Sequence, residues 1–287
     1  MTNGADGGKK ARREHAREIA RQEREADKRR KKRNRLLLQG GGIVAVLAVV
    51  AVVAVVIATS TPKSTTNPAN MASDGILFTG DGTTVTPVLT EALEAGSDPV
   101  PTDTDALGDT VNIVTYIDYA CPYCNDFETT NAEQIEGWVQ QGAATLEVHP
   151  ISILDRMSLG TKYATRAANA AACVASTEPD SFLDVSAALF ANQPAEQTSG
   201  IDTAALKQLV ADAGADGDAV ASCIDDRTYE SWVAAATDRV SNGELASTTV
   251  TEFTGTPTVL VNGQQYDGAL DDAEAFQAFV ASVAAAG

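Results

Sequence analysis

Residues 111–124 read Val-Asn-Ile-Val-Thr-Tyr-Ile-Asp-Tyr-Ala-Cys-Pro-Tyr-Cys, an apolar run that leads into a Cys-x-x-Cys pair. The run 111–117 predicts a buried strand, and the segment after Cys124 has the apolar period of a helix. At such a junction Cys121 lies at a helix N-terminus, where unpaired N–H groups and the helix dipole stabilise a thiolate. Pro122 suits the first helical turn, which needs no N–H donor. The pair therefore indicates thiol–disulfide exchange, in which the thiolate is the attacking species.

The same pair could instead be half of a zinc site or a local structural disulfide. Zinc needs further Cys or His ligands at local spacing, but Cys173 and Cys223 are single and distant, and no His is close in sequence. A disulfide within Cys-x-x-Cys closes a tight ring, which suits a labile bond better than a durable one. Both alternatives are weaker than redox exchange, and no metal or cofactor is expected.

Charge divides the chain into zones. Residues 1–35 hold 14 of the 21 Lys and Arg residues but only six of the 39 Asp and Glu residues, which gives a net charge of +8. The whole chain has a net charge of −18, so residues 36–287 carry −26. Between the basic tail and the acidic bulk, residues 36–58 form an uncharged apolar stretch of 23 residues, long enough to cross ~30 Å of hydrocarbon.

We expect this stretch to be a retained transmembrane helix, with the basic tail cytoplasmic and the acidic domain extracytoplasmic. A cleaved signal peptide is the alternative, but its charged region would be unusually long and no convincing small-x-small cleavage site follows. The tail does not predict nucleic-acid binding, because attraction to anionic lipid beside a membrane span is the simpler account. Residues 59–73 are polar and aperiodic, and we expect a flexible linker to a domain at 74–287.

The domain at 74–287 combines strand-like and helical sequence, which predicts an α/β fold. Strands are expected at 76–78, 111–117, 144–148, 258–261 and 264–266, the last two joined by the hairpin signal Asn262-Gly263. A closing helix is expected to begin at Asp271, with Glu274 three residues on. Between about 159 and 245 the pattern is helical and rich in Ala, which indicates a helical subdomain inserted into the strand-bearing part.

Two further cysteines lie on different predicted helices of that insertion. Each of Cys173 and Cys223 alone would more often be a small buried core residue. Together, in one subdomain of an oxidising compartment, they favour a structural disulfide. Such a bridge would also keep these thiols from competing with the Cys-x-x-Cys pair.

The order of these elements resembles the DsbA-like branch of the thioredoxin superfamily. The resemblance rests on Asp-Tyr-Ala-Cys-Pro-Tyr-Cys at 118–124 and Gly-Thr-Pro-Thr-Val-Leu-Val-Asn-Gly at 255–263, and it covers about residue 75 to the C-terminus. It implies a thioredoxin-like fold with an inserted helical subdomain, here preceded by one transmembrane helix. Cys121 would be the exposed nucleophile and Cys124 the buried resolving partner.

The same resemblance implies further roles around the pair. Pro257 would form a cis peptide bond facing the disulfide, and Thr256 would offer backbone groups to an extended substrate. Pro122 and Tyr123, between the two cysteines, would also contact substrate. A cis proline is held only where the structure demands it, and a proline is tolerated at the start of a strand. Without the resemblance, an ordinary trans proline would be equally expected.

One position departs from the family pattern. Many members keep a buried carboxylate six residues before the first Cys, where this chain has Thr115. The family uses that acid for proton transfer to the buried thiol, so its loss leaves the proton route open. Asp118 and Asp126 are the nearest acids; Asp118 could substitute through water, although a solvated loop acid is the simpler interpretation.

His149 follows a predicted strand and could be read as a catalytic base. A Cys–His protease would need a single nucleophile with an orienting group, which the paired cysteines argue against. A surface or lightly packed His is therefore expected.

The sequence thus predicts an extracytoplasmic thiol–disulfide oxidoreductase anchored in the cell membrane. We expect an oxidase that donates its disulfide to unfolded secreted proteins and is reoxidised by a membrane partner, by resemblance a quinone-linked one. A reductase or isomerase is the first alternative, because direction depends on redox poise. A non-catalytic module that binds extended peptides in the cis-Pro groove is the second.

Overall fold

The computed structural model describes residues 28, 66–245, 250 and 252–286 of the chain. The chain divides into two units, Met1–Ser60 and Thr61–Gly287, and the second unit contains every strand of the described part. The apolar stretch 36–58, predicted to cross a membrane, lies outside the described residues. Within the residues that the structure does describe, no helix combines the length and the apolar character that a bilayer crossing requires.

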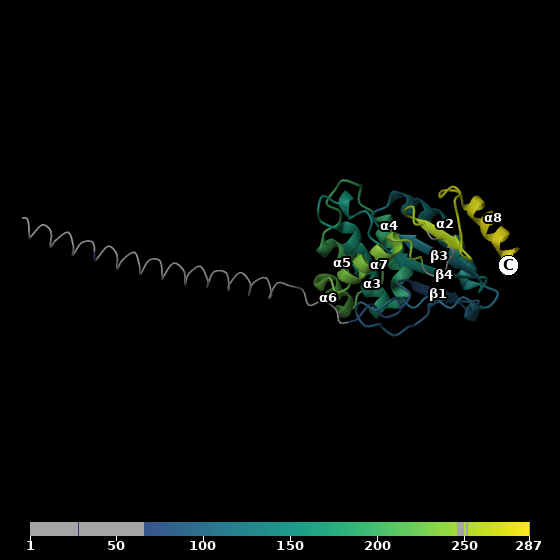
Figure 1. Cartoon of the computed structure of the whole chain (residues 1–287), viewed down its shortest axis with the longest axis horizontal. Helices are drawn as coiled ribbons and strands as arrows, with labels where there is room; N and C mark the ends of the chain where they lie inside the picture. The colour runs from purple at the N-terminus through teal and green to yellow at the C-terminus, as the bar shows by residue number, and fades with distance from the viewer. Residues whose placement is uncertain (1–27, 29–65, 246–249, 251, 287) are drawn as a thin grey trace, which may run out of the picture. The chain divides into compact units, whose positions relative to one another are not determined.

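A mixed β-sheet forms the centre of the second unit (Figure 1). Its strand order is β2-β1-β4-β3-β5-β6, and only β3 and β4 run parallel to each other within it. The strands are β1 Ile76–Gly80, β2 Val85–Pro87, β3 Val111–Ile117, β4 Ala144–Pro150, β5 Thr258–Val261 and β6 Gln264–Gln265. The expected strands at 111–117 and 258–261 are confirmed with these bounds, and the strand expected from Ala144 continues to Pro150.

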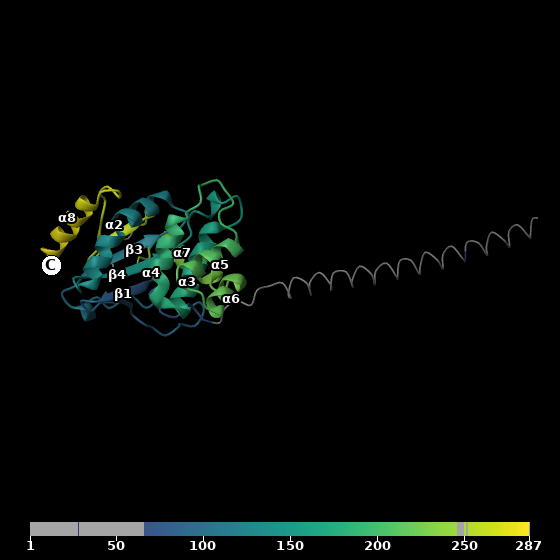
Figure 2. The same cartoon turned by 180° about the vertical axis from the view of Figure 1, so that it is seen from behind.

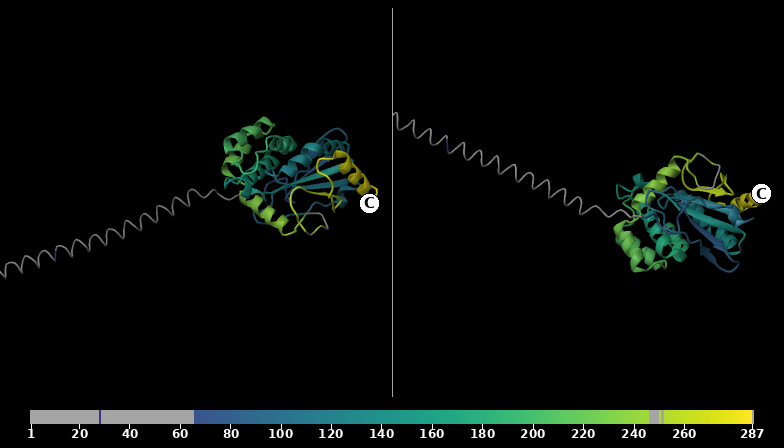
Figure 3. Two further views of the ribbon diagram at one scale, coloured as in Figure 1. Left: turned by 90° about the horizontal axis from the view of Figure 1, so that it is seen from above. Right: turned by 60° about the horizontal axis from the view of Figure 1, so that its bottom comes forward.

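The helices follow the order that the sequence predicted. Helix α2, Pro122–Gln140, follows β3 directly, and α8, Ala273–Ala284, closes the described chain. Between β4 and β5 lie α3 Tyr163–Thr177, α4 Phe182–Ala191, α5 Thr203–Asp212, α6 Asp218–Asp226 and α7 Glu230–Ser241. Figures 1 and 2 show α3, α5, α6 and α7 grouped at one end of the sheet, with α8 at the other. Figure 3 shows the same separation from two further directions.

Both faces of the sheet are covered. On one face α2 and α8 pack together, with the rings of Phe127 and Phe276 edge to face at 5.2 Å between centroids. On the other face a smaller cluster contains Tyr116 of β3, Leu260 of β5 and Val240 of α7. Because both faces are buried, β3 and β5 read as nearly continuous apolar runs rather than alternating ones.

Two local sequence signals, a hairpin turn and a helix cap, predicted the positions of their elements to within one residue. Asn262 and Gly263 both have positive φ, 46° and 75°, as a tight hairpin between β5 and β6 requires. The helix expected to begin with Asp271 as its cap is capped instead by Asp272, whose carboxylate accepts the Ala275 N–H. Asp272 takes the capping role because its carboxylate reaches the free N–H three residues further along the helix.

The linker expected at 59–73 is wrong for the part that the structure describes. Asn67, Asn70 and Met71 are buried, and Met71 belongs to the main hydrophobic core. The Asn70 side chain donates a hydrogen bond of 2.8 Å to the Ala175 carbonyl of α3. Polar composition suggested a free tether, but amide side chains can also satisfy buried backbone groups, and here they dock the segment onto the insertion.

Candidate active site

The two central cysteines lie where β3 leads into α2. Cys121 is the N-cap of α2, with extended backbone angles, and Pro122 is the first helical residue. The Cys121 N–H donates to the Asp118 carbonyl at 2.9 Å, which fixes the turn between strand and helix. No side chain caps this helix end, and the backbone N–H groups of Tyr123 and Cys124 act on the Cys121 sulfur. Both cysteines are present as free thiols.

The environment separates the two thiols chemically. The pKa of Cys121 falls to about 6 from an ordinary 9.0, chiefly because the Cys124 thiol donates a hydrogen bond to it. Burial opposes this shift, while Thr256 and the backbone N–H groups of Cys124 and Tyr123 add to it. Burial first, and then the hydrogen bond to Cys121, raises the pKa of Cys124 well above its ordinary value. The pair is therefore poised as one thiolate beside one thiol.

The expected exposed nucleophile is largely covered in this structure. Cys121 is 4% exposed and Cys124 is 0% exposed, so Cys121 is only slightly the more accessible of the two. The neighbouring Tyr123 is 66% exposed, and Pro122 is exposed as well. The intervening dipeptide thus presents the surface beside the sulfur, while the sulfur itself lies just beneath it.

The segment 255–263, on which the family resemblance also rests, meets the cysteines in space. The Thr256-Pro257 peptide bond is cis, as the family resemblance implied. The Cys121 sulfur lies 3.2 Å from the Thr256 carbonyl oxygen, across 135 residues of chain, and donates to it when Cys121 is protonated. Strand β5 starts at Thr258, directly after Pro257, so the sheet fixes this contact. The structure therefore brings Cys121, Thr256 and Pro257 into one site.

One residue at this site was missed by the sequence analysis. Gln193, in the segment between α4 and α5, donates hydrogen bonds from its amide nitrogen to the carbonyls of Tyr119 and Cys121, each at 3.0 Å. It ties the helical insertion to the active-site turn. No local pattern marks a lone Gln more than seventy residues away, so only the fold reveals it.

Asp118 is a buried acid rather than the solvated one that was expected. It is 0% exposed, and its carboxylate accepts the Ala120 N–H at 2.8 Å and the Leu154 N–H at 2.9 Å. Burial raises its pKa to about 7 against these two hydrogen bonds, with a further increase from the charge of Cys121. Asp126 is exposed. Asp118 thus interacts electrostatically with Cys121. It does so from the turn after β3, whereas the carboxylate of the family pattern would lie within β3, at the position of Thr115.

His149 is also different from the expectation of a surface residue. It is buried, its ring stacks on Tyr116 with centroids 4.5 Å apart, and its Nε2 lies 3.2 Å from a Glu147 carboxylate oxygen. A Cβ on Gly75 would come within 2.5 Å of the His149 ring, so only glycine fits beneath it. Glu147 and His149 share one face of β4 because they are two residues apart, a signal that the sequence already contained.

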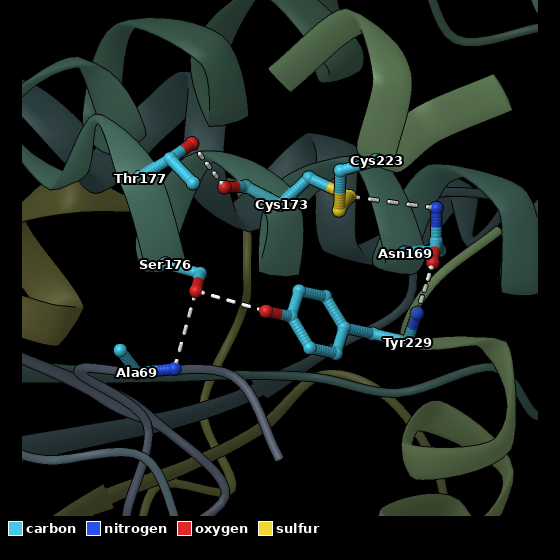
Figure 4. Close-up of a disulfide and its surroundings, with 7 residues drawn as sticks. All are labelled: Ala69, Asn169, Cys173, Ser176, Thr177, Cys223 and Tyr229. Atoms are coloured by element: carbon cyan, nitrogen blue, oxygen red, sulfur yellow. Dashed lines mark hydrogen bonds between the residues drawn. A yellow bond between two sulfur atoms is a disulfide. The ribbon is translucent and has the colours of Figure 1, made fainter. Parts of the chain in front are cut away.

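The remaining cysteines form a disulfide between α3 and α6 (Figure 4). Cys173 and Cys223 have Cα atoms 5.8 Å apart, which confirms the bridge that the sequence predicts. Nearby, Asn169 accepts the Tyr229 N–H at 2.8 Å, and the Tyr229 hydroxyl lies 2.9 Å from that of Ser176. Because these two sulfurs are bonded to each other, they are not available as further ligands for the zinc alternative.

A dithiol at a helix N-terminus, with one thiolate stabilised and a cis-proline segment against it, defines the class of thiol–disulfide oxidoreductases. The thioredoxin family model matches residues 104–281, and the chain belongs to this family. A comparison with curated proteins gives no match.

Solved structures of similar proteins agree with this class. The reduced disulfide bond oxidoreductase DsbG of Mycobacterium tuberculosis is 27% identical, with a TM-score of 0.55, and the match covers 73% of this chain and 87% of that one. Reduced DsbA of the same organism is 25% identical, with a TM-score of 0.51, over 73% of this chain and 98% of that one. BdbD of Bacillus subtilis, at 18% identity and a TM-score of 0.51, shares the fold over 78% of this chain and 98% of that one.

Proposed function

We propose that this protein is a membrane-tethered, extracytoplasmic oxidase that donates the Cys121–Cys124 disulfide to secreted proteins. The observation that carries the direction is the separation of the two thiol pKa values, with that of Cys121 lowered to about 6. A stabilised thiolate stabilises the reduced form, which makes the oxidised form a better electron acceptor. The similarity to the mycobacterial disulfide bond oxidoreductase DsbG and to DsbA of the same organism supports disulfide exchange as the reaction.

The reaction needs two exchange steps. A substrate thiolate attacks the Cys121 sulfur, a bond forms between them, and the Cys121–Cys124 bond breaks with its electron pair leaving on Cys124, which then takes up a proton. A second substrate thiolate attacks the substrate sulfur of the mixed disulfide and releases Cys121 as a thiolate. The substrate is oxidised by two electrons and the protein becomes a dithiol. A membrane partner, by family resemblance quinone-linked, would reoxidise it.

Substrate contacts are assigned to the surface around Cys121. The exposed Tyr123 ring and Pro122 would pack against apolar side chains of an unfolded chain. The Thr256 carbonyl, beside the cis bond to Pro257, would accept a main-chain hydrogen bond from an extended peptide. Such contacts are independent of side-chain sequence, which suits a catalyst that acts on many secreted proteins.

The proposed location rests on the sequence. A tail of net charge +8 followed by 23 uncharged apolar residues favours a cytoplasmic N-terminus and an external domain. Protease added to spheroplasts is expected to remove the acidic domain and spare the basic tail. A soluble mature protein that begins near residue 60 would instead show that a signal peptide had been cleaved.

The reduction potential of the Cys121/Cys124 couple tests the direction. An oxidase should lie between about −180 and −120 mV, in the range of protein disulfide isomerase and DsbA, and well above thioredoxin at about −270 mV. Equilibration with glutathione buffers, followed by alkylation and mass measurement, gives the value. A potential near that of thioredoxin would favour the reductase alternative. If replacement of both cysteines left the cellular function intact, a peptide-binding module would be the correct assignment.

A further inference from the structure

The first exchange step leaves a buried thiolate at Cys124 that needs a proton. Cys124 is 0% exposed, and the groups that act on its sulfur are the Cys121 sulfur, the Thr256 side chain and the Asp118 backbone N–H at 3.4 Å. A backbone amide can donate a hydrogen bond but cannot give up its proton at neutral pH. The position where the family resemblance places a carboxylate holds Thr115. Protonation of Cys124 therefore requires another acid that can reach this region.

A cavity of about 240 Å³ lies on the Thr115 side of the sheet, between β3, β4, α2 and α4. Thr115 is 1% exposed, and its hydroxyl lines this cavity without a hydrogen-bond partner in the described protein. Ser186 of α4 adds a second hydroxyl, which accepts a hydrogen bond of 3.2 Å from Tyr119. A space of this size with polar groups in its wall is large enough for several water molecules, each of which occupies ~30 Å³.

Three acids of α2 line this cavity, and Glu128 is the one of them that is not exposed. It lies four residues after Cys124 on α2, so the two side chains share a helix face. Glu128 lines the same cavity as Thr115 and is half-buried. Burial, with a smaller effect from the charge of Glu136, raises the pKa of Glu128 to about 7. At neutral pH this carboxyl can both hold and release a proton, as a general acid must.

We propose that Glu128 exchanges the proton of Cys124 through water held against Thr115 in this cavity. The inference rests on the proposed oxidase function and adds its proton route. When the substrate thiolate displaces Cys124, the proton passes from the neutral Glu128 carboxyl through water to the Cys124 sulfur. Glu128 is left as a carboxylate and recovers a proton from solvent. In the reverse reaction, the same path takes the proton away before Cys124 attacks.

The other ionisable groups near this path are less suited than Glu128 to supply the proton. On α2 the exposed Glu133 and Glu136 lie at the cavity wall, and Asp184 of α4 acts on Glu136. Tyr119 is a phenol whose pKa is raised by burial, so it stays neutral, and the strands contribute uncharged side chains to the cavity. Asp118 is the competing acid, because its pKa is also about 7, although each of its carboxylate oxygens already accepts one backbone N–H.

The test is single-turnover reduction of the oxidised full-length protein by a dithiol peptide, with acid quenching, alkylation and mass measurement. Rates are divided by the thiolate fraction of the peptide at each pH. In the wild type this corrected rate should fall above about pH 7, as Glu128 loses its proton. Glu128→Gln should lower the rate ~100-fold at neutral pH and remove the fall, since general acid catalysis contributes 10²–10⁴-fold. Glu133→Gln, on the same helix with the same loss of charge, should behave as the wild type.

Thr115 provides an independent arm. Thr115→Val should lower the rate but retain the fall near pH 7, because the carboxyl remains and the water contact is lost. Thr115→Ser, which keeps the hydroxyl, should restore the wild-type rate. A Glu128→Gln variant with wild-type rates and pH profile, or equal rates for the two Thr115 variants, would overturn the proposal. A wild-type protein that does not exchange with the peptide at any pH would instead refute the proposed function.

Discussion

The lowered pKa of Cys121 makes the stability of the reduced protein depend on pH. A thiol with a pKa of about 6 in the folded state and 9.0 when unfolded has lost its proton in the fold while the unfolded chain still holds one. Stability of the reduced form should therefore rise with pH between about 6 and 9, and the gain should be lost as pH falls through about 6. The oxidised form has no thiol at this position and should lack this dependence.

The size of the effect follows from the three-unit shift. Each unit corresponds to 1.36 kcal/mol, so the full difference is ~4 kcal/mol above pH 9. Linkage gives ~1.4 kcal/mol at pH 7, and a gain of ~2 kcal/mol between pH 6 and pH 8. Since 30 mV corresponds to about 1.4 kcal/mol for two electrons, the thiolate makes the couple ~30 mV more oxidising at pH 7.

The measurement is denaturant unfolding of the reduced and the oxidised protein at a series of pH values, with thiolate formation followed by ultraviolet absorbance. Subtracting the oxidised curve removes most of the contribution of carboxyl groups such as Asp118, which titrate in both forms. Cys121→Ser is the matched control, since it removes the thiolate and keeps Cys124. A difference between the redox forms that is independent of pH would refute the reasoning, as would an unchanged slope in Cys121→Ser.

Three further outcomes are expected. The charge of Cys121 raises the pKa of Asp118, and repulsion between two charges is mutual, so Asp118→Asn should lower the pKa of Cys121 further. Alkylation rates across pH measure this; a higher pKa would show that the carboxyl acts mainly by shaping the turn. Cys124→Ser should trap secreted proteins on Cys121 as mixed disulfides, seen as reductant-sensitive adducts on gels and absent when Cys121 is also replaced; a folded variant without adducts would contradict the exchange mechanism. The Cys173–Cys223 bond should survive mild reduction that opens the active-site pair; free Cys173 and Cys223 thiols after such treatment would show that the bond is labile. Replacing both residues by Ala should cost about 4 kcal/mol of stability, since the bond closes a loop of 50 residues.

The sequence predicted the parts of the fold that depend on local periodicity and turn chemistry. The apolar runs that became β3 and β5 were bounded correctly, because both are buried on two faces and end at polar or turn residues. The helix after the cysteine pair was predicted by the apolar period that follows Cys124 and by Pro122 in the first turn. The cis bond at Pro257, in contrast, was implied only by the family resemblance, because local sequence does not distinguish it from a trans bond.

Burial set by tertiary packing was the part that sequence could not supply. Asp118 looked like a loop acid because it follows a strand, yet the Leu154 N–H from a distant segment closes over it. Asn70 looked like part of a linker, yet it docks on α3. In each case a polar side chain found its partner far away along the chain, and no local pattern encodes that partner.

The stabilised thiolate lies in a strongly acidic domain, which bears on how it is stabilised. Residues 36–287 carry a net charge of −26, and a field of that sign opposes a negative sulfur. The lowered pKa of Cys121 therefore depends on short-range donors, namely the Cys124 thiol and the first N–H groups of α2, which act within hydrogen-bond distance. A carboxylate fixed directly beneath the pair would add to the opposing field. Thr115 at that position adds no charge beneath the thiolate. Asp118 and Glu128, whose pKa values are about 7, are partly neutral at pH 7 and give the site a source of protons without a permanent negative charge there.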